Sequence, residues 1–194
     1  MRQQRFDMRG FVPEMIAYYE TEGWRAYYDR NWLRAFGLLV HLCESQFHIP
    51  FPRSFLAVYH VIRASIAFVP TDHNLEIVLH HLERFYRIAA AANHSAFDPH
   101  LVAQLELQYW VIHRRLAATP EADKRRLVAC VAALHGALFG CPPAELWASA
   151  ESRVEAASAV DRITSRRSND VTADWVHVAA SLRRAYQQVK QAVG

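Results

Sequence analysis

The prolines of this chain mark where its helices can begin and end. Proline lacks a backbone N–H and clashes with the preceding turn, so a helix accepts it in the first turn and excludes it from the interior. Asp98-Pro99 and Thr119-Pro120 each place an N-capping side chain before a proline at the first helical position. Three further prolines can open helices in the same way: Pro13, Pro52 and Pro143. The others follow apolar segments at whose ends we expect helices to stop: Pro50, Pro70 and Pro142.

Between the prolines, apolar residues recur every three or four positions, which is the spacing of one helix face. In the third segment this stripe consists of Phe55, Val58 or Tyr59, Ile62, Ile66 and Val69. No segment combines β-branched alternation with the Asn-Gly or Asp-Gly turn of a hairpin. Capping side chains for the remaining helices are Asp29 or Asn31, Asp72 and Asp170. The sequence therefore predicts an all-α fold with helices near residues 13–28, 31–48, 52–68, 72–93, 99–117, 120–139, 143–165 and 171–192.

The length of 194 residues suits a single helical domain, residues 1–194, with two halves of four helices, 13–93 and 99–192. A shift of 92 residues aligns Glu14 with Glu106 and Tyr18 with Trp110, which suggests an internal duplication. Two architectures follow: a compact antiparallel bundle, or a short solenoid of stacked α-hairpins. We favour the bundle, because segments 52–93 and 143–192 carry wide apolar faces that a single layer would leave partly exposed.

Composition limits the partners and the compartment. The net charge of +3 is too small to indicate a nucleic-acid partner, and no apolar run is long enough to span a membrane. The three cysteines are irregularly spaced and indicate neither a disulfide framework nor a zinc finger. The first residues are charged and lack the apolar region of a signal peptide. We therefore expect a soluble cytoplasmic protein.

One helix face combines aromatic and ionisable residues. Glu106, Trp110 and His113 lie at helical spacing, beside an apolar stripe through Tyr109. Such a face either meets another helix, with Glu106 paired to an arginine or histidine, or forms the wall of a ligand pocket. We add Tyr18 to the pocket hypothesis, because the 92-residue shift aligns it with Trp110.

Carboxylate and imidazole pairs suggest a second kind of site. Ferritin-like di-iron bundles use one lone Glu from each of two helices and a Glu-x-x-His pair from each of two others. By analogy, Glu14 and Glu106 would be the lone carboxylates. The paired ligands of a divalent transition metal would be Glu76 with His80 and Asp174 with His177. Neither pair is Glu-x-x-His, since the first is Glu-x-x-x-His and the second is Asp-x-x-His, so this is an analogy and not a family resemblance.

No motif of nucleophilic catalysis or nucleotide binding occurs, and only six glycines are present to build a phosphate loop. The segment 17–32 is rich in aromatic residues, which either pack the first predicted helix against the second or form an interface through Trp24, Tyr28 and Trp32. The favoured interpretation is a non-catalytic interaction or regulatory module that binds a protein partner or forms a homodimer. The alternative is a bundle that binds a small molecule, haem or metal, with an oxidoreductase activity as one outcome.

Overall fold

The computed structural model describes residues 8–93, 97–119 and 122–194, and over these residues it contains helices and no strand. A 3₁₀ turn, η1 (Met8–Gly10), precedes the first helix, and another, η2 (Pro143–Leu146), precedes the seventh. The α-helices are α1 (Pro13–Tyr28), α2 (Trp32–Phe47), α3 (Arg53–Phe68), α4 (Leu75–Asn93), α5 (Pro99–Ala117), α6 (Arg125–Phe139), α7 (Trp147–Thr164) and α8 (Val171–Val193). The prediction of an all-α fold with eight helices is confirmed.

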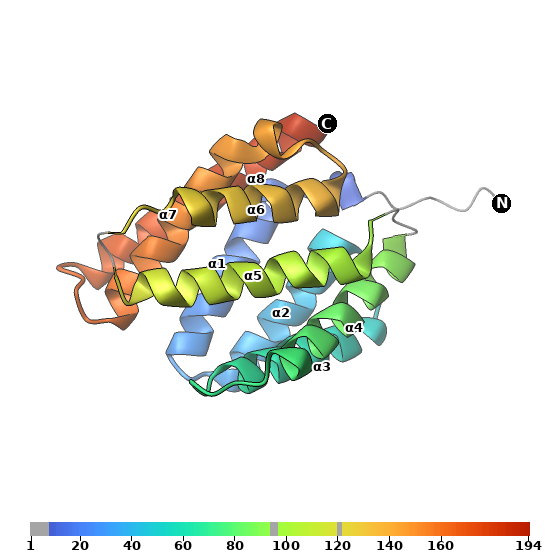
Figure 1. The fold of residues 1–194 in the computed structure, drawn as a ribbon, viewed down its shortest axis with the longest axis horizontal. Helices are drawn as coiled ribbons and strands as arrows, with labels where there is room; N and C mark the ends of the chain where they lie inside the picture. The colour runs from blue at the N-terminus through green and yellow to red at the C-terminus, as the bar shows by residue number, and fades with distance from the viewer. Residues whose placement is uncertain (1–7, 94–96, 120–121) are drawn as a thin grey trace.

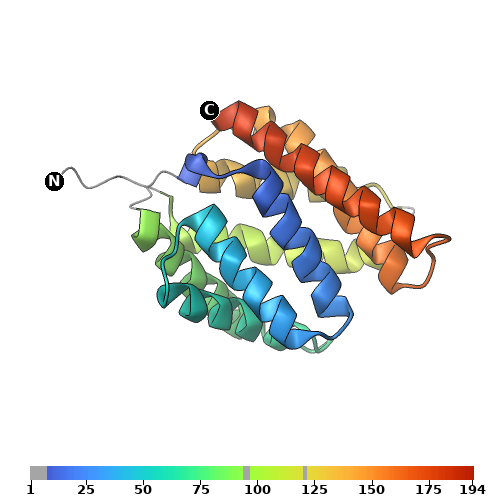
Figure 2. The same ribbon diagram turned by 180° about the vertical axis from the view of Figure 1, so that it is seen from behind.

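The helices form a closed arrangement. Each helix packs against the next along the chain, and α1 also packs against α8. Two views of the molecule from opposite sides show α5 crossing the middle of one side and α1 crossing the middle of the other (Figures 1 and 2). The preferred compact bundle is therefore correct, because an open solenoid would separate its first and last helices. The duplication of the two halves stays a prediction.

Local chemistry sets most helix starts. Side chains of Asn31, Asp98 and Asp170 accept hydrogen bonds from backbone N–H groups of the first turns of α2, α5 and α8, as predicted. Asp72 was the expected cap of the fourth helix, but Asn74 accepts from the N–H groups of Glu76 and Ile77, and α4 starts later. The sixth helix starts at Arg125 and not near residue 120; Pro120 lies outside the described residues, so its predicted role does too.

The main hydrophobic core draws buried residues from every α-helix, and a smaller cluster joins α5, α6 and α7. Cys43 and Cys130 are buried in these clusters as free thiols, and Cys141 is a partly exposed free thiol. Within the described ranges, no single helix is long and apolar enough to cross a membrane. The bent pair Arg125–Phe139 and Pro143–Thr164, with 116° between its helices, does pass a test of length and composition.

Candidate functional site

The face of α5 that carries Glu106 packs against another helix. The Trp110 Nε1–H donates to Glu106 Oε1 at 2.7 Å, and the Tyr86 hydroxyl of α4 donates to Glu106 Oε2 at 3.3 Å. Burial raises the pKa of Glu106, while the positive charge of Arg153 and the two hydrogen bonds oppose that shift. The protein itself thus occupies both carboxylate oxygens, and this face is a helix contact with Arg153 as the nearby cation.

A buried ion pair joins α1 to α7 at the centre of the bundle. The Arg153 guanidinium donates to Glu20 as a fork, with N–O distances of 2.9 and 2.5 Å, and the Tyr186 hydroxyl of α8 donates to Glu20 Oε2 at 2.5 Å. The Arg153 and Glu20 side chains are only 14% and 7% exposed. Desolvation of two ions is offset only when geometry and additional hydrogen bonds are good, as they are here.

A histidine lies in the same region without a full set of partners. His135 on α6 is 6% exposed, and its Nδ1 has no hydrogen bond among the described residues. Burial, and secondarily the charge of Arg153, lowers the pKa of His135 to about 3. The imidazole is therefore neutral in the folded protein at neutral pH. No sequence motif singles out Glu20, Arg153 or His135, because Glu20 is distant in the chain from the other two and no fixed spacing relates the three helices that carry them.

The residues proposed as a ligand wall are divided between three places. Glu106 and Trp110, both half-buried on α5, bond to each other. His113 Nε2 lies 3.0 Å from Asp161 Oδ2 of α7, and its ring stacks on Tyr109 with centroids 5.6 Å apart. Tyr18 is 56% exposed on α1, beside Tyr19. The pocket of four residues is thus not formed, since its members face different neighbours.

The six predicted metal ligands are also separated. Arg162 donates to Asp174 at 2.6 Å, and His177 lies 3.1 Å from Glu155, so both find partners on α7. Gln187 donates to Glu14 at 2.8 Å. The others lie inside the bundle or on the exposed side of α4: Glu106, and Glu76 with His80. In the part of the chain that the structure describes, no three His, Cys, Asp or Glu side chains come together to hold a metal ion. The structure therefore does not bring the six residues together as the ferritin-like analogy requires.

The three aromatic residues proposed as an interface differ in their exposure. Trp24 is half-buried and packs against the core, and the Arg153 guanidinium lies 5.8 Å from its ring centroid. Tyr28 and Trp32 are exposed, and Trp32 contacts Tyr27 edge-on. Their part in an interface stays a prediction.

The largest departure from the predicted pattern is on α3. Four members of its apolar stripe face outward, with Phe55 45%, Tyr59 49%, Ile66 61% and Val69 64% exposed, and Ile62 is half-buried. The helix buries its other side instead, through Ser54, Ala57, Val58, Ala64 and Phe68. Small side chains let α3 approach α4 closely. The stripe correctly predicted a helix but not which side of it is buried.

Two rings extend this outward surface beyond α3. Phe36 of α2 and Phe51 of the preceding turn each lie against Phe55, with ring centroids 5.3 and 5.4 Å apart. We call the whole surface the α3 face. Its members are Phe36, Phe51, Phe55, Tyr59, Ile62, Ile66 and Val69.

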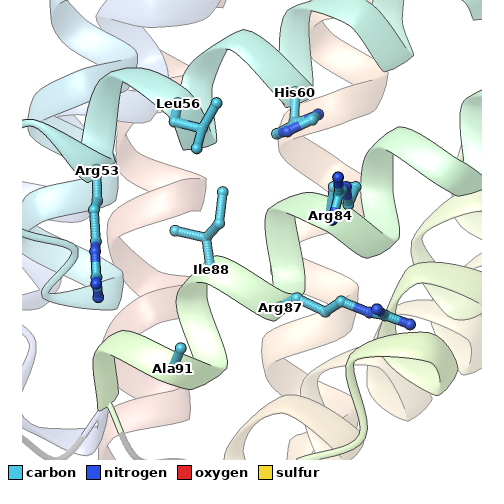
Figure 3. Close-up of a pocket in the computed structure, with 7 residues that line it drawn as sticks. All are labelled: Arg53, Leu56, His60, Arg84, Arg87, Ile88 and Ala91. Carbon is cyan, nitrogen blue, oxygen red and sulfur yellow. The ribbon is translucent and has the colours of Figure 1, made fainter.

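A groove of about 420 Å³ runs beside the α3 face, between α3 and α4 (Figure 3). Leu56 and Ile88 point toward each other across it, and arginines lie around them (Figure 3). Its lining residues are Arg53, Leu56, His60, Arg84, Arg87, Ile88 and Ala91. We call this hollow the α3–α4 groove.

The charge of the groove comes from its arginines. Arg87 pairs with Glu83, whereas Arg53 and Arg84 have no hydrogen bond or ion pair with any residue that the structure places. His60 Nδ1 lies 3.1 Å from His81 Nδ1. Burial lowers the pKa of His60, and the neighbouring His81 and Arg84 lower it further, so this imidazole is neutral at neutral pH.

The α3 face and the α3–α4 groove adjoin along α3 and together form the candidate site. Comparison of the chain with known protein families, with curated proteins and with solved structures finds no match. A signal in the sequence does point to α3: this segment has two arginines, no carboxylate, and apolar residues on nearly every side. The direction of its large side chains required the structure.

Proposed function

We propose that this protein is a binding module whose interface with another protein is the α3 face. The observation that carries the proposal is the continuous apolar surface along the length of α3, exposed in the isolated chain. Soluble monomers rarely expose contiguous apolar patches larger than roughly a few hundred Å², and large patches of this kind often mark interaction sites. Phe55 and Tyr59 add aromatic side chains, which are enriched where binding energy is concentrated.

The packing of the inner side of α3 against the bundle supports a role of its outer side in binding. Ala57, Val58 and Ala64 of its inner side are fully buried, so the helix is fixed against the bundle. The exposed side chains therefore stand on a rigid element, which lowers the entropy lost on binding. Glu20, Arg153 and Glu106, by contrast, form hydrogen bonds within the chain.

Site-specific photo-crosslinking tests the proposal in cells that express the full chain. A benzophenone amino acid replaces Tyr59 on the α3 face or Val176 on α8, both exposed apolar positions. We expect a defined crosslinked species from position 59 and none from position 176. Substitution of Ile66 by serine in the position-59 chain is expected to weaken that species. Equal adducts at both positions, or none at either, would show that the α3 face is not an interface.

A further inference from the structure

We propose that the occupant of this interface is an acidic amphipathic helix that lies along the α3–α4 groove. This inference rests on the proposed function and specifies the chemistry of the partner. Apolar side chains of the partner would contact the α3 face and enter the groove between Leu56 and Ile88. Its carboxylates would reach the arginines on either side of the groove. Recognition of this kind, a helix in a groove, uses apolar residues at i, i+3 or i+4, and i+7.

Charge selects an acidic partner. Helix α3 contributes Arg53 and Arg63 and has no Asp or Glu, and α4 adds Arg84 and Arg87 across the groove. Arg53, Arg63 and Arg84 form no ion pair with described residues, so their charges are free to act on a ligand. Glu83 already engages Arg87 and His100. Guanidinium groups bind carboxylates as planar forks, which would fix the register of the partner helix.

Spacing along α4 also fits a helical ligand. Arg84 and Arg87 are three residues apart and therefore lie one turn from each other on the same side of α4. Carboxylates three or four residues apart on a partner helix repeat over a similar distance. Arg53 lies on the opposite wall, beside Leu56. A partner helix would therefore present acidic residues on both flanks of its apolar stripe.

A second copy of this chain fits the surface less well. In a twofold symmetric contact the same patch meets itself, so the arginines of one copy would approach those of the other. The α3 segment offers no carboxylate to compensate that repulsion. An anionic bilayer would match the charge and the apolar residues, but a planar surface does not fill a hollow of about 420 Å³ between two helices.

The experiment selects ligands without assuming their sequence. The probe is a displayed library of helix-favouring peptides of about 15 residues, whose side chains vary freely on all faces, selected on the full chain. Enriched peptides are then synthesised with a fluorophore, and their Kd is measured by fluorescence polarisation. We expect them to combine helical apolar spacing with an excess of Asp and Glu. Enriched peptides that are neutral or basic, or no enrichment, would overturn the proposal.

Matched variants assign the binding to the groove. The double variant Arg53→Glu/Arg84→Glu reverses the charge of both walls and is expected to weaken binding about tenfold or more, because like charges then meet at the interface. The control Arg115→Glu/Arg126→Glu makes the same charge change at exposed positions on α5 and α6 and should leave the Kd unchanged. Circular dichroism of both variants confirms that they fold. Equal Kd values for the two variants would overturn the proposal.

Two further results separate this inference from the proposed function. A position-59 crosslink to a second copy would assign the α3 face to a homodimer, which overturns the acidic partner and retains an interface. Co-sedimentation with phosphatidylcholine–phosphatidylserine vesicles, lost in the double variant and kept in the control, would assign the surface to a membrane. That result overturns the acidic partner as well, and it also removes the protein partner from the proposed function.

Discussion

The centre of the bundle and the surface of α3 depart in opposite directions from the usual distribution of residues. At the centre, Glu20 and Arg153 are ions with little exposure to water. On α3, Phe55, Tyr59 and Ile66 are large apolar side chains with about half or more of their surface exposed. These two regions differ in whether their side chains find partners within the chain. The ions find partners within the chain, and the α3 face does not.

The two regions also differ in when their unfavourable free energy is offset, which is the desolvation of ions at the centre and the exposure of apolar surface to water on α3. The fork between Arg153 and Glu20, with the Tyr186 hydroxyl, offsets desolvation as soon as the chain folds. The exposed face of α3 would be compensated only on binding. Substitutions at the centre should therefore act on folding, and substitutions on α3 should act on association.

The largest effect is expected from Arg153→Met. The change leaves Glu20 buried without its cation and should lower the free energy of unfolding by about 3–5 kcal/mol. Urea denaturation followed by circular dichroism measures it. The matched control, Arg184→Met, removes an arginine whose side chain is 49% exposed and paired with Glu155, and should cost about 1 kcal/mol or less. Similar losses in the two variants would show that the central ion pair is not special.

The next effect concerns the pH dependence set by His135. Its pKa is about 3 in the folded protein against an ordinary value of 6.5. Between these two pH values the imidazole is protonated in the unfolded chain and neutral in the folded protein. This destabilisation is absent above pH 6.5 and grows as pH falls, reaching about 2 kcal/mol at pH 5. His135→Leu should therefore be less destabilised than the wild type between pH 7 and pH 5.

Urea midpoints at several pH values measure this difference. His41→Leu serves as the control, since it removes a histidine on α2 whose side chain is 60% exposed and leaves His135 in place. If His135→Leu followed the wild-type curve, protonation of His135 would not be the cause of the acid destabilisation.

Glu106→Gln should change the free energy of unfolding by a smaller amount than His135→Leu does. Its advantage over the wild type should grow as pH rises, whereas that of His135→Leu grows as pH falls. Burial raises the pKa of Glu106, so its neutral form is favoured on folding and the stability that it contributes is lost as pH rises from 4.5 through the raised value. Glutamine is neutral throughout and its side-chain oxygen can still accept from Trp110. The variant should therefore gain stability relative to the wild type as pH rises, and a parallel pair of pH profiles would contradict this.

The same contrast explains how much the sequence could predict. The helix count and most boundaries followed from local rules, such as Asp98 and Asp170 as caps and proline at the first turn of α1 and α5. These features depend on neighbours a few residues away. The start of α6 was misjudged because Thr119, the expected cap, instead donates through its hydroxyl to the carbonyl of Arg115.

The central ion pair and the exposed side of α3 were both beyond local rules, each for its own reason. Arg153 and Glu20 are 133 residues apart, and no periodicity relates α1 to α7. On α3, apolar residues occupy both sides of the helix, with Phe55 on the exposed side and Phe68 on the buried side, so the spacing allows either side to be buried. The compact bundle was favoured partly because it would cover such a wide apolar face, and yet this face of α3 is exposed. Close packing of Ala57 and Ala64 against the core decided between the two sides.

The smallest effect on folding is expected from Tyr59→Ser/Ile66→Ser, although both residues are large and apolar. Exposed positions typically change the free energy of unfolding by about 0.5 kcal/mol or less, because the side chain stays in water in both states. Val58→Ala, one residue away on the buried side, should cost about 1–3 kcal/mol through the cavity that it leaves. The double serine variant should nevertheless lose the crosslink from a probe at position 55. A large loss of stability in the serine variant would mean that these side chains support the fold, and the distinction between a self-sufficient centre and an interface on α3 would then fail.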